Sequence, residues 1–421
     1  MHGAVLLDEN NNVLRPAILW NDGRSQQECV ELESECPQTG QITSNQLMPG
    51  FQAPKIKWIE KHEPDTFKRI HRVLLPKDYL RWKITGVFAT DMSDASGTSF
   101  LDVSKRDWSD VMLAACKLNR SHMPKLLEGN ETSGMVLESV ANDWNMLSGG
   151  VPVVAGAGDN AAGAIGLGIY KPGQAMLSLG TSGVYFVVDK SVKPDHVANE
   201  IIMYCHCLPH MWHQMFVMLS AAECLDWVAQ LTGATSVESL LAEVESGTRA
   251  STPVWFLPFL SGERKAGDSR HNYGSLIGLT NEHKRVDIAR AVLEGVAFAF
   301  ARGIDTLHAS CTSKPESIAL IGGGARSAMW RQMLANVTGQ TLEYYEGGDV
   351  GPALGAARLA HVAMNPTKSL DQVIPPTTSL NLIQRHIPDP QLHQQYLHLQ
   401  KHFDQLYNIL LPLSSLNQSI K

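Results

Sequence analysis

The chain lacks several features that would assign it to large classes of proteins. No Gly-Lys dipeptide occurs in its 421 residues, so a P-loop, which needs G-x-x-x-x-G-K-[ST], is excluded. No uninterrupted apolar run reaches about 18 residues. No charged and apolar leader stands at the start, so we expect neither membrane insertion nor secretion.

Cysteine and charge exclude further classes. Seven cysteines, an odd number without a framework spacing, favour reduced thiols and a cytosolic location. The net charge of −7 gives no basic excess, which argues against a nucleic-acid partner. With 44% hydrophobic and 18% charged residues, the composition fits a two-domain enzyme that acts on small molecules.

Two glycine turns, each after a strand-like run, carry the first functional signal. The apolar run Val151 to Ala155 predicts a buried strand, and Gly156 and Gly158 let Asp159 and Asn160 project at its carboxyl end. A carboxylate there can take a proton from a hydroxyl. The second run, residues 175–179, ends in Gly-Thr-Ser-Gly, whose N–H groups and hydroxyls suit phosphate oxygens. Together they predict phosphoryl transfer to an alcohol.

A dinucleotide fingerprint is the competing interpretation, since residues 156–161 satisfy the loose pattern G-x-G-x-x-G/A. Asp159 would then lie in the loop that approaches a pyrophosphate. The stretch about 20 residues further on, where a ribose-binding acid belongs, reads Leu-Ser-Leu-Gly-Thr. We therefore disfavour a dehydrogenase. The glycines could also be only tight turns of an α/β core.

Two further glycine turns lie downstream. Residues 322–327 follow an expected strand, Ser317 to Ile321, and precede a helix from about Met329, so their backbone can approach a purine closely. Residues 347–352 lead into a helix of small residues, where Gly355 would allow close packing onto a sheet or a ligand. The first turn suits a ligand, and the second is more typical of a structural element.

Cys205-His206-Cys207 with His210 and His213 could bind zinc, but the spacing fits no usual zinc pattern. An alternating strand over 203–208 that turns at residue 209 into a strand over 212–218 explains the sequence as well. We therefore assign no metal to these residues.

The alternation of strand and helix patterns predicts an α/β fold. We expect an N-terminal domain over 1–170, a C-terminal domain over 171–365 and a linker with a terminal helix over 366–421. Helices are expected over Arg285 to Ile304 and over Gln391 to Leu411, the second packing back as core through an apolar stripe. That stripe comprises Leu392, Tyr396, Leu399, Phe403, Leu406 and Ile409.

At this point the residues resemble the FGGY carbohydrate kinases over nearly the whole chain. Residues 274–279, 287–288 and 291–295 are similar to that family's C-terminal signature. Residues 50–59 are similar to its N-terminal signature, with a departure at Gln52. The resemblance implies the two-domain actin and hexokinase fold, which is ribonuclease H-like, with a cleft between duplicated α/β domains.

Within the family, residues 1–3, 19–24, 75–80 and 91–97 are most similar to bacterial members that act on a ketopentose. This likeness implies that Asp159 is the base, and that the sugar is bound by Met1, His2, Asp159 and Asn160. ATP, with Mg²⁺ bound to it, would be the phosphoryl donor. The residues implied to face ATP are Gly180, Thr181 and Ser182 at the phosphates and Gly278, Gly323, Gly324 and Ser327 at the adenosine.

The resemblance also carries a departure at the beginning. Family members open with a strand and an Asp-x-Gly-Thr-Ser phosphate turn, which here would precede Met1. We expect a chain without that turn to be an incomplete N-terminal domain and an impaired kinase, because such groups supply charge neutralisation. Residues 4–7 and 13–19 should still form a hairpin without its other neighbour. The alternatives are an inactive chain that binds sugar or nucleotide, and a kinase for another polyol or ketose. The resemblance allows a homodimer.

Overall fold

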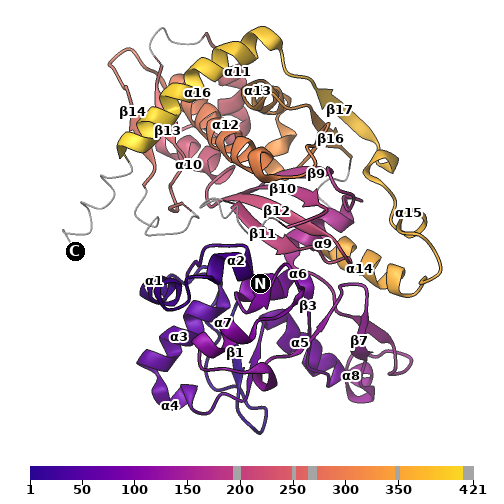
Figure 1. Ribbon diagram of the computed structural model, residues 1–421. Helices are drawn as coiled ribbons and strands as arrows, with labels where there is room; N and C mark the ends of the chain where they lie inside the picture. The colour runs from indigo at the N-terminus through magenta and orange to yellow at the C-terminus, as the bar shows by residue number, and fades with distance from the viewer. Residues whose placement is uncertain (193–200, 249–252, 264–272, 347–350, 411–421) are drawn as a thin grey trace. The chain divides into compact units, whose positions relative to one another are not determined.

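The computed structural model describes residues 1–192, 201–248, 253–263, 273–346 and 351–410 (Figure 1). The chain forms two compact units, each assembled from separate stretches of sequence. Unit 1 contains Met1–Pro172, Val188–Gln214 and Val350–Ser379, and unit 2 contains Gly173–Val187, Met215–Asp349 and Leu380–Lys421. Two strands, β10 (Gly183–Asp189) and β12 (Trp212–Met218), each run from one unit into the other.

Unit 1 alternates short strands and helices. The strands are β1 (Val5–Leu7), β2 (Arg72–Leu74), β3 (Ala89–Asp91), β4 (Leu101–Asp102), β5 (Asp107–Trp108), β6 (Lys125–Leu127), β7 (Thr132–Met135), β8 (Pro152–Val154) and β11 (Ile201–Cys205). The helices are α1 (Gln26–Glu35), α2 (Thr39–Thr43), α3 (Gln52–His62), α4 (Pro64–Phe67), α5 (Pro76–Thr85), α6 (Met92–Ala95), α7 (Asp110–Ala115), α8 (Glu138–Asp143), α9 (Asp159–Gly166), α14 (Pro352–Ala363) and α15 (Leu370–Val373). Short 3₁₀ turns are η1 (Ser96–Thr98), η2 (Arg120–His122) and η5 (Thr377–Ser379).

β1 has neighbours on both sides. The isolated bridges Ala4↔Ile18 and Leu7↔Val13 form the predicted hairpin. On the other side β2 pairs with β1 in antiparallel register along its whole length. The expectation that this hairpin would lack its other neighbour was therefore wrong, because residues 72–74 occupy that side.

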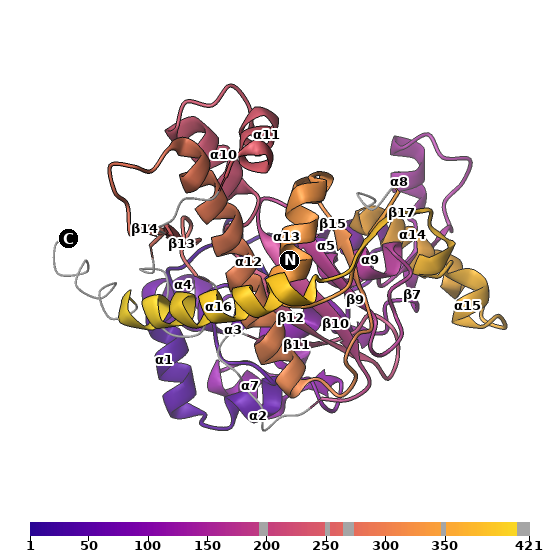
Figure 2. The same ribbon diagram turned by 90° about the horizontal axis from the view of Figure 1, so that it is seen from above.

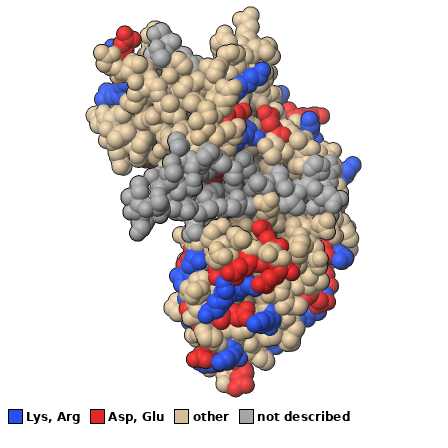
Figure 3. All heavy atoms as spheres, turned by 60° about the vertical axis from the view of Figure 1, so that its left-hand side comes forward, with Lys and Arg blue, Asp and Glu red and all other residues tan. Residues whose placement is uncertain are grey.

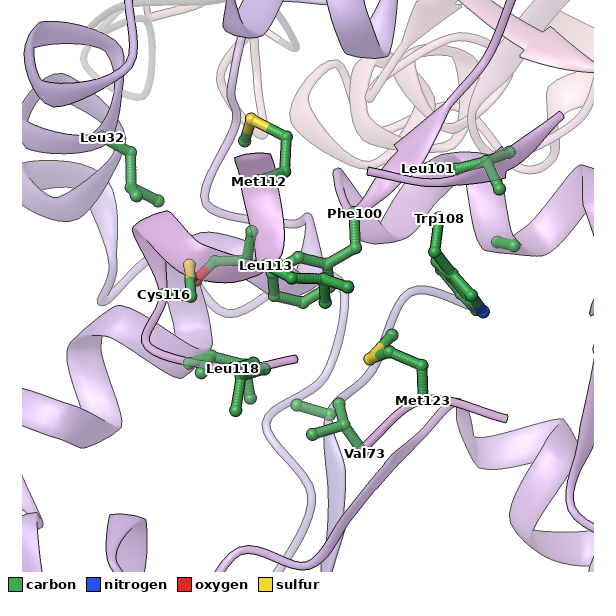
Figure 4. Close-up of a cluster of buried hydrophobic side chains, with 14 of the residues drawn as sticks. Leu32, Val73, Phe100, Leu101, Trp108, Met112, Leu113, Cys116, Leu118 and Met123 are labelled. Atoms are coloured by element: carbon green, nitrogen blue, oxygen red, sulfur yellow. Dashed lines mark hydrogen bonds between the residues drawn. The ribbon is translucent and has the colours of Figure 1, made fainter. Parts of the chain in front are cut away.

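A large apolar cluster forms the core of unit 1 (Figure 4). It joins α1, α7 and the strands β2, β4 and β5 through side chains that are almost entirely buried, among them Leu32, Phe100 and Leu113. Trp108 lies in the same cluster, and its indole N–H donates to the carbonyl of Pro124 at 2.9 Å. Burial of such side chains stabilises a fold by about 1.5–3 kcal/mol each.

The helices α9 and α14 approach unusually closely within unit 1. Gly355 on α14 lies against the backbone of α9, and a Cβ atom at this position would be 1.7 Å from the carbonyl oxygen of Ala162. Nearby, Nη1 of Arg358 donates to the carbonyls of Ile165 at 3.0 Å and Gly166 at 2.8 Å, the last turn of α9. The predicted close packing at Gly355 is present, but its partner is a helix and not the sheet or ligand that we expected. This packing fixes the helix that Asp159 begins.

Unit 2 is organised around a sheet. Its strands are β9 (Ala175–Leu179), β13 (Trp255–Leu257), β14 (Ser275–Ile277), β15 (Ile318–Ile321), β16 (Leu342–Tyr345) and β17 (Leu382–His386). Its helices are α10 (Glu223–Leu231), α11 (Val237–Ser246), α12 (Arg285–Ser310), α13 (Ala328–Thr338) and α16 (Pro390–Leu410), with the 3₁₀ turn η4 (Gly323–Arg326). The sheet order is β11-β12-β10-β9-β15-β16-β17. β15 is parallel to β9 and to β16, while β10 is antiparallel to β9 and β17 is antiparallel to β16.

The longest helix, α12, is the centre of unit 2. Glycines allow its close contacts: a Cβ on Gly295 would lie 2.2 Å from the carbonyl oxygen of Phe256. The terminal helix α16 packs against α12 and α13 (Figures 1 and 2). Phe298 and Phe403 meet there at 5.4 Å between ring centroids. The predicted packing of α16 is confirmed at Phe403, although Leu392 and Ile409 are exposed and only part of the expected stripe faces the core.

β12 confirms the strand predicted over 212–218, whereas the first strand, β11, covers 201–205 and ends before the predicted limit at residue 208. His206 and Cys207 lie between them and are fully buried. Burial, with a smaller effect of Arg106, lowers the pKa of His206 to about 3. Burial raises the pKa of Cys207 well above its ordinary value. A neutral imidazole and a neutral thiol in this position are typical of core residues.

The described surface mixes both signs of charge. Basic and acidic side chains gather together on the face of unit 1 seen in Figure 3. Ion pairs of this kind in unit 1 include Lys61 with Glu31 and Arg120 with Asp107. None of the helices in the described part of the chain has the length and apolar character that crossing a membrane requires.

Candidate active site

Asp159 lies at the start of α9, after the strand β8. The predicted turn is present: Gly156 has φ +80°, which a residue with a side chain rarely adopts. The Asp159 side chain is exposed. Its Oδ1 accepts hydrogen bonds from the backbone N–H of Asn160 at 2.8 Å and from the Asn160 side chain at 3.1 Å. The carboxylate is therefore oriented by its neighbour and open to a ligand.

Met1 and His2 belong to the same region of unit 1. The Cε atom of Met1 lies 3.3 Å from the position that a Cβ on Gly158 would take, one residue before Asp159. The backbone N–H of Gly158 donates to Oγ of Ser93 at 2.8 Å. His2 contacts the residue that follows Ser93, since its Nδ1 lies 3.2 Å from Oδ1 of Asp94. The structure therefore connects Met1, His2 and Asp159 through α6.

A cluster of charges that sequence reasoning did not assign lies at α5 and α6. Lys77 forms ion pairs with the fully buried carboxylates of Asp78 and Asp91, and lies 3.9 Å from that of Asp94. Burial lowers the pKa of Lys77, but these three carboxylates outweigh it and raise that pKa above its ordinary value. Arg81 pairs with Asp78 at 2.9 Å and donates to the carbonyl of residue 155, at the end of β8. The cluster fixes the base of the Asp159 turn.

Two of the predicted phosphate-binding residues, Thr181 and Ser182, lie exposed in unit 2 between β9 and β10. Two backbone carbonyls of the turn accept hydrogen bonds from other backbone groups of the protein. The N–H groups of Ala221 and Ala222 donate to the carbonyls of Thr181 and Gly180, each at 2.8 Å. These bonds tie the turn to the start of α10 and leave its hydroxyls on the surface.

The turn that begins at Gly322 lies directly against Gly180. Gly322 has φ +92°, and a Cβ on it would lie 2.7 Å from the carbonyl of Leu179 and 2.9 Å from the nitrogen of Gly180. A Cβ on Gly324 would also meet Leu179, at 2.8 Å, whereas Gly323 has open space. The parallel pairing of β9 with β15 brings the two turns to one edge of the sheet. Their proximity supports a shared ligand such as a nucleotide.

Ser327 and Gly278 have structural surroundings of their own. The hydroxyl of Ser327 accepts the N–H of Trp330 at 3.2 Å and so caps α13. Gly278 has φ +86° and follows β14, which pairs with β13 outside the main sheet. The described contacts therefore join Gly180 with Gly322 and Gly324 but do not bring Gly278 to them. Residues 347–350, from the fourth glycine turn, lie outside the described residues.

Arg331, to which the sequence analysis gave no role, is hydrogen-bonded to the backbone of the turn η4. Its Nη1 donates to the carbonyls of Ala325 at 2.6 Å and Arg326 at 3.2 Å. Its Nε and Nη2 donate to His386 at 2.9 Å and Gln384 at 2.7 Å on β17. The only sequence signal was an arginine in the first turn of a helix after glycines, which is too common to be used alone.

The two groups of residues suit a kinase chemically. Unit 1 supplies an exposed carboxylate, and unit 2 supplies adjoining glycine turns with hydroxyls. Among the residues that the structure describes, no three His, Cys, Asp or Glu side chains are grouped to hold a metal ion by themselves. Magnesium that enters with ATP is bound mainly by phosphates, water and one or two carboxylates.

Models of two protein domains match the chain. The N-terminal domain of the FGGY family of carbohydrate kinases matches residues 1–166, and the C-terminal domain of the same family matches residues 175–364. Together these ranges include the turn at Asp159 and both glycine turns of unit 2.

Individual relatives agree with the domain models. The chain is 56% identical to the xylulose kinase of Escherichia coli (strain K12), covering 98% of this chain and 84% of that protein. It is 52% identical to the xylulose kinase of Klebsiella pneumoniae, with 99% and 84% covered. Among solved structures, a xyloylose kinase from Brucella ovis is 41% identical with a TM-score of 0.89, covering 98% of this chain and 84% of that one. The xylulose kinase from Rhodospirillum rubrum is 27% identical with a TM-score of 0.87, covering 98% and 83%.

Proposed function

Because the chain belongs to the FGGY family of carbohydrate kinases, we propose that it is an ATP-dependent xylulose kinase. The relatives that are more than half identical to it carry that name. The reaction transfers the γ-phosphoryl group of Mg-ATP to D-xylulose and gives D-xylulose 5-phosphate and ADP. The family assignment supports phosphoryl transfer from ATP, and the identity of the sugar and of the metal is part of the proposal.

The observation that carries the mechanism is the placement of Asp159. Its carboxylate is exposed at the start of α9. The preceding residue, Gly158, lies near Met1 and is hydrogen-bonded to α6, the helix that also contacts His2. In the proposal Asp159 takes the proton of the sugar's 5-hydroxyl while the oxygen of that hydroxyl bonds to the γ-phosphorus. The bond between that phosphorus and the β,γ-bridging oxygen breaks, and ADP leaves with its electron pair. Asn160 orients Asp159 and contributes a hydrogen-bonding amide to the sugar.

The nucleotide half of the proposal lies in unit 2. Gly180, Thr181 and Ser182 would hold the phosphates with N–H groups and hydroxyls, and magnesium would arrive bound to them. Gly323, which has open space around it, would let the adenosine approach the backbone. Ser327 and Gly278 remain part of this proposed site. We also propose a cytosolic enzyme, and a homodimer as its assembly.

The test compares this chain with its Asp159→Asn variant. We expect ADP release from Mg-ATP to depend on D-xylulose and to fall by about 10²–10⁴-fold in the variant, the usual contribution of a general base. Asp143→Asn is the matched control, because Asp143 is an exposed acid at the end of α8 in the same unit. It should leave turnover unchanged.

The same assay separates the alternatives. Faster turnover with ribulose, glycerol or gluconate would show that xylulose is not the preferred substrate. A folded protein that shows a calorimetric binding signal for xylulose or ATP without turnover would be an inactive sugar or nucleotide binder. Either result would contradict the proposed activity.

A further inference from the structure

The backbone of His2 is held from both sides. Its φ is +52°, a left-handed conformation that is uncommon for histidine. Nζ of the buried Lys55 donates to the His2 carbonyl at 2.9 Å. The side chain of Gln52 donates to the carbonyl of Gly3, also at 2.9 Å. Two buried side chains of α3 therefore fix the direction in which the imidazole leaves the backbone.

The ring of His2 is closely packed on three sides. It meets Phe51 and Tyr204 edge to face, with ring centroids 6.2 and 5.7 Å apart. On a third side lies Gly97, where a Cβ atom would be 2.0 Å from Nδ1. The ring can occupy this position only because residue 97 has no side chain. His2 is 9% exposed, so these neighbours enclose most of the ring.

Asp94 faces the Nδ1 edge of that ring. Its Oδ1 lies 3.2 Å from Nδ1, and the Asp94 side chain is fully buried. Burial raises the pKa of Asp94, but the adjacent His2 and Lys77 outweigh it, so that pKa lies below its ordinary value. An ionised carboxylate only accepts hydrogen bonds. A lone pair on Nδ1 would be repelled at this distance, so the proton belongs on Nδ1.

The helix that carries Asp94 also reaches the Asp159 turn. Ser93 accepts the N–H of Gly158 at 2.8 Å, and its own hydroxyl is bonded to Asp91, the N-cap of α6. One turn of helix therefore sets both His2 and the residue before the proposed base. Asp91 and Asp94 share the counter-charge of Lys77.

We propose that Asp94 is a positioning residue that holds a proton on Nδ1 of His2 and leaves Nε2 for a hydrogen bond with a sugar hydroxyl. The identity of the ligand rests on the proposed kinase function. The protonation of the ring does not, because it follows from the contact with Asp94 alone. No covalent step passes through either residue.

The first test is Asp94→Asn, which keeps the shape but can present either an oxygen or an NH₂ group to Nδ1. In protein labelled with ¹⁵N-histidine, the His2 signals are identified by their loss in His2→Gln. We expect the wild-type ring to carry its proton on Nδ1 and the variant to lose that preference. The KM for D-xylulose should rise at least ten-fold, with the KM for ATP within two-fold. Asp102→Asn, a buried carboxylate bonded to residues 104 and 105, is the control.

A second test changes Gly97, which packs against the ring of His2. It also covers the case in which the Asp94→Asn protein does not fold. Gly97→Ala leaves the carboxylate intact but displaces the ring from it, so it should also raise the KM for D-xylulose at least ten-fold. In a His2→Ala background the same Gly97→Ala change should add less than two-fold, because the space is then empty.

The outcomes separate the two proposals. A wild-type ring protonated on Nε2 alone, an Asp94→Asn ring that keeps its Nδ1 proton, or an unchanged KM for xylulose would each overturn the role of Asp94. A wild-type protein without xylulose turnover would defeat the kinase proposal. In that case the ¹⁵N signals still decide the tautomer, and the xylulose Kd from calorimetry replaces KM.

Discussion

His206 illustrates how a single buried residue links stability to pH. Its Nδ1 accepts the N–H of Leu208 at 3.2 Å, so the proton of the neutral ring is on Nε2. Burial and then the nearby charge of Arg106 lower the pKa of His206 to about 3. The folded state therefore binds a proton less readily than the unfolded chain, where histidine titrates near about 6.5.

We predict that this histidine makes the protein less stable in acid. Its contribution to the free energy of unfolding is fully present above about pH 6.5 and is lost as pH falls toward 3, at about 1.4 kcal/mol per pH unit. His206→Asn, which keeps an acceptor for Leu208, should reduce the slope of unfolding free energy against pH between about 6 and 4 by that amount. Urea unfolding at several pH values measures it. His210→Asn changes an exposed ring and should leave the slope unchanged.

At the same scale, local sequence patterns select some candidate residues and miss others. Asp159 was predicted because a carboxylate after a strand and two glycines is a local pattern. The exposed hydroxyls of Thr181 and Ser182 were predicted for the same reason. Lys77 and Asp94 were not assigned a role, because their surroundings come from residues far apart in the chain. His2 and Asp94 are 92 positions apart, and no periodicity records that contact.

At the scale of elements, the contact between α9 and α14 sets a strict size limit. Ala162 presents backbone to Gly355, and the three nearest atoms to an added Cβ are all backbone atoms of that residue, at 1.7, 2.5 and 3.0 Å. Backbone of a helix cannot rotate away as a side chain can. The two helices would have to separate.

We therefore predict that Gly355→Ala lowers the free energy of unfolding by about 1–3 kcal/mol, the usual cost of overpacking. This would occur although alanine favours helix by about 1 kcal/mol over glycine. Ala357→Ser, at an exposed position of the same helix, is the control and should change stability by less than about 0.5 kcal/mol. Thermal or urea unfolding measures both. A more stable Gly355→Ala protein would contradict the described packing.

Whole elements were predicted more reliably than their neighbours in space. β9 and α12 stand out because each has a clear apolar pattern and turn residues at its ends. The adjacency of Gly180 and Gly322 could not be predicted, since it follows from the parallel pairing of β9 with β15 across about 140 residues of sequence. Likewise β2 was not foreseen as a partner of β1, because Val5 pairs with Leu74, which lies 69 positions later in the chain and beyond several intervening helices.

At the scale of the whole molecule, all seven cysteines are buried thiols that form no disulfide. Burial raises the pKa of Cys116 to about 12 and that of Cys205 to about 11. The thiolate is the reactive form of cysteine. These thiols are therefore protected twice, because burial keeps reagents away and the raised pKa keeps the sulfur protonated.

We predict that the native protein reacts slowly with Ellman's reagent at pH 8 and that unfolding in guanidinium releases seven reactive thiols. The absorbance of the released thionitrobenzoate gives both rate and number. A thiol in the native protein that reacts as fast as free cysteine would show that one of these positions is open to solvent. Ligand binding that slows the remaining reaction would indicate that opening passes through the site.

The division of the sequence at residues 170 and 365 stays a prediction. The first unit begins at Met1 but also takes residues 188–214 and 350–379, so continuous domains and compact units need not coincide. Composition along the chain can mark a linker, but it cannot show that a later segment returns to an earlier unit.

That return has a consequence for synthesis on the ribosome. Helix α9 emerges early, but its partner α14 is translated almost 200 residues later, within the last segment that unit 1 requires. At about 5–20 residues per second, the early part of unit 1 waits on the order of ten seconds or more for that segment. During this interval the surface of α9 that later meets Gly355 is available to chaperones. The order of translation, and not only the final packing, therefore decides when this unit can become complete.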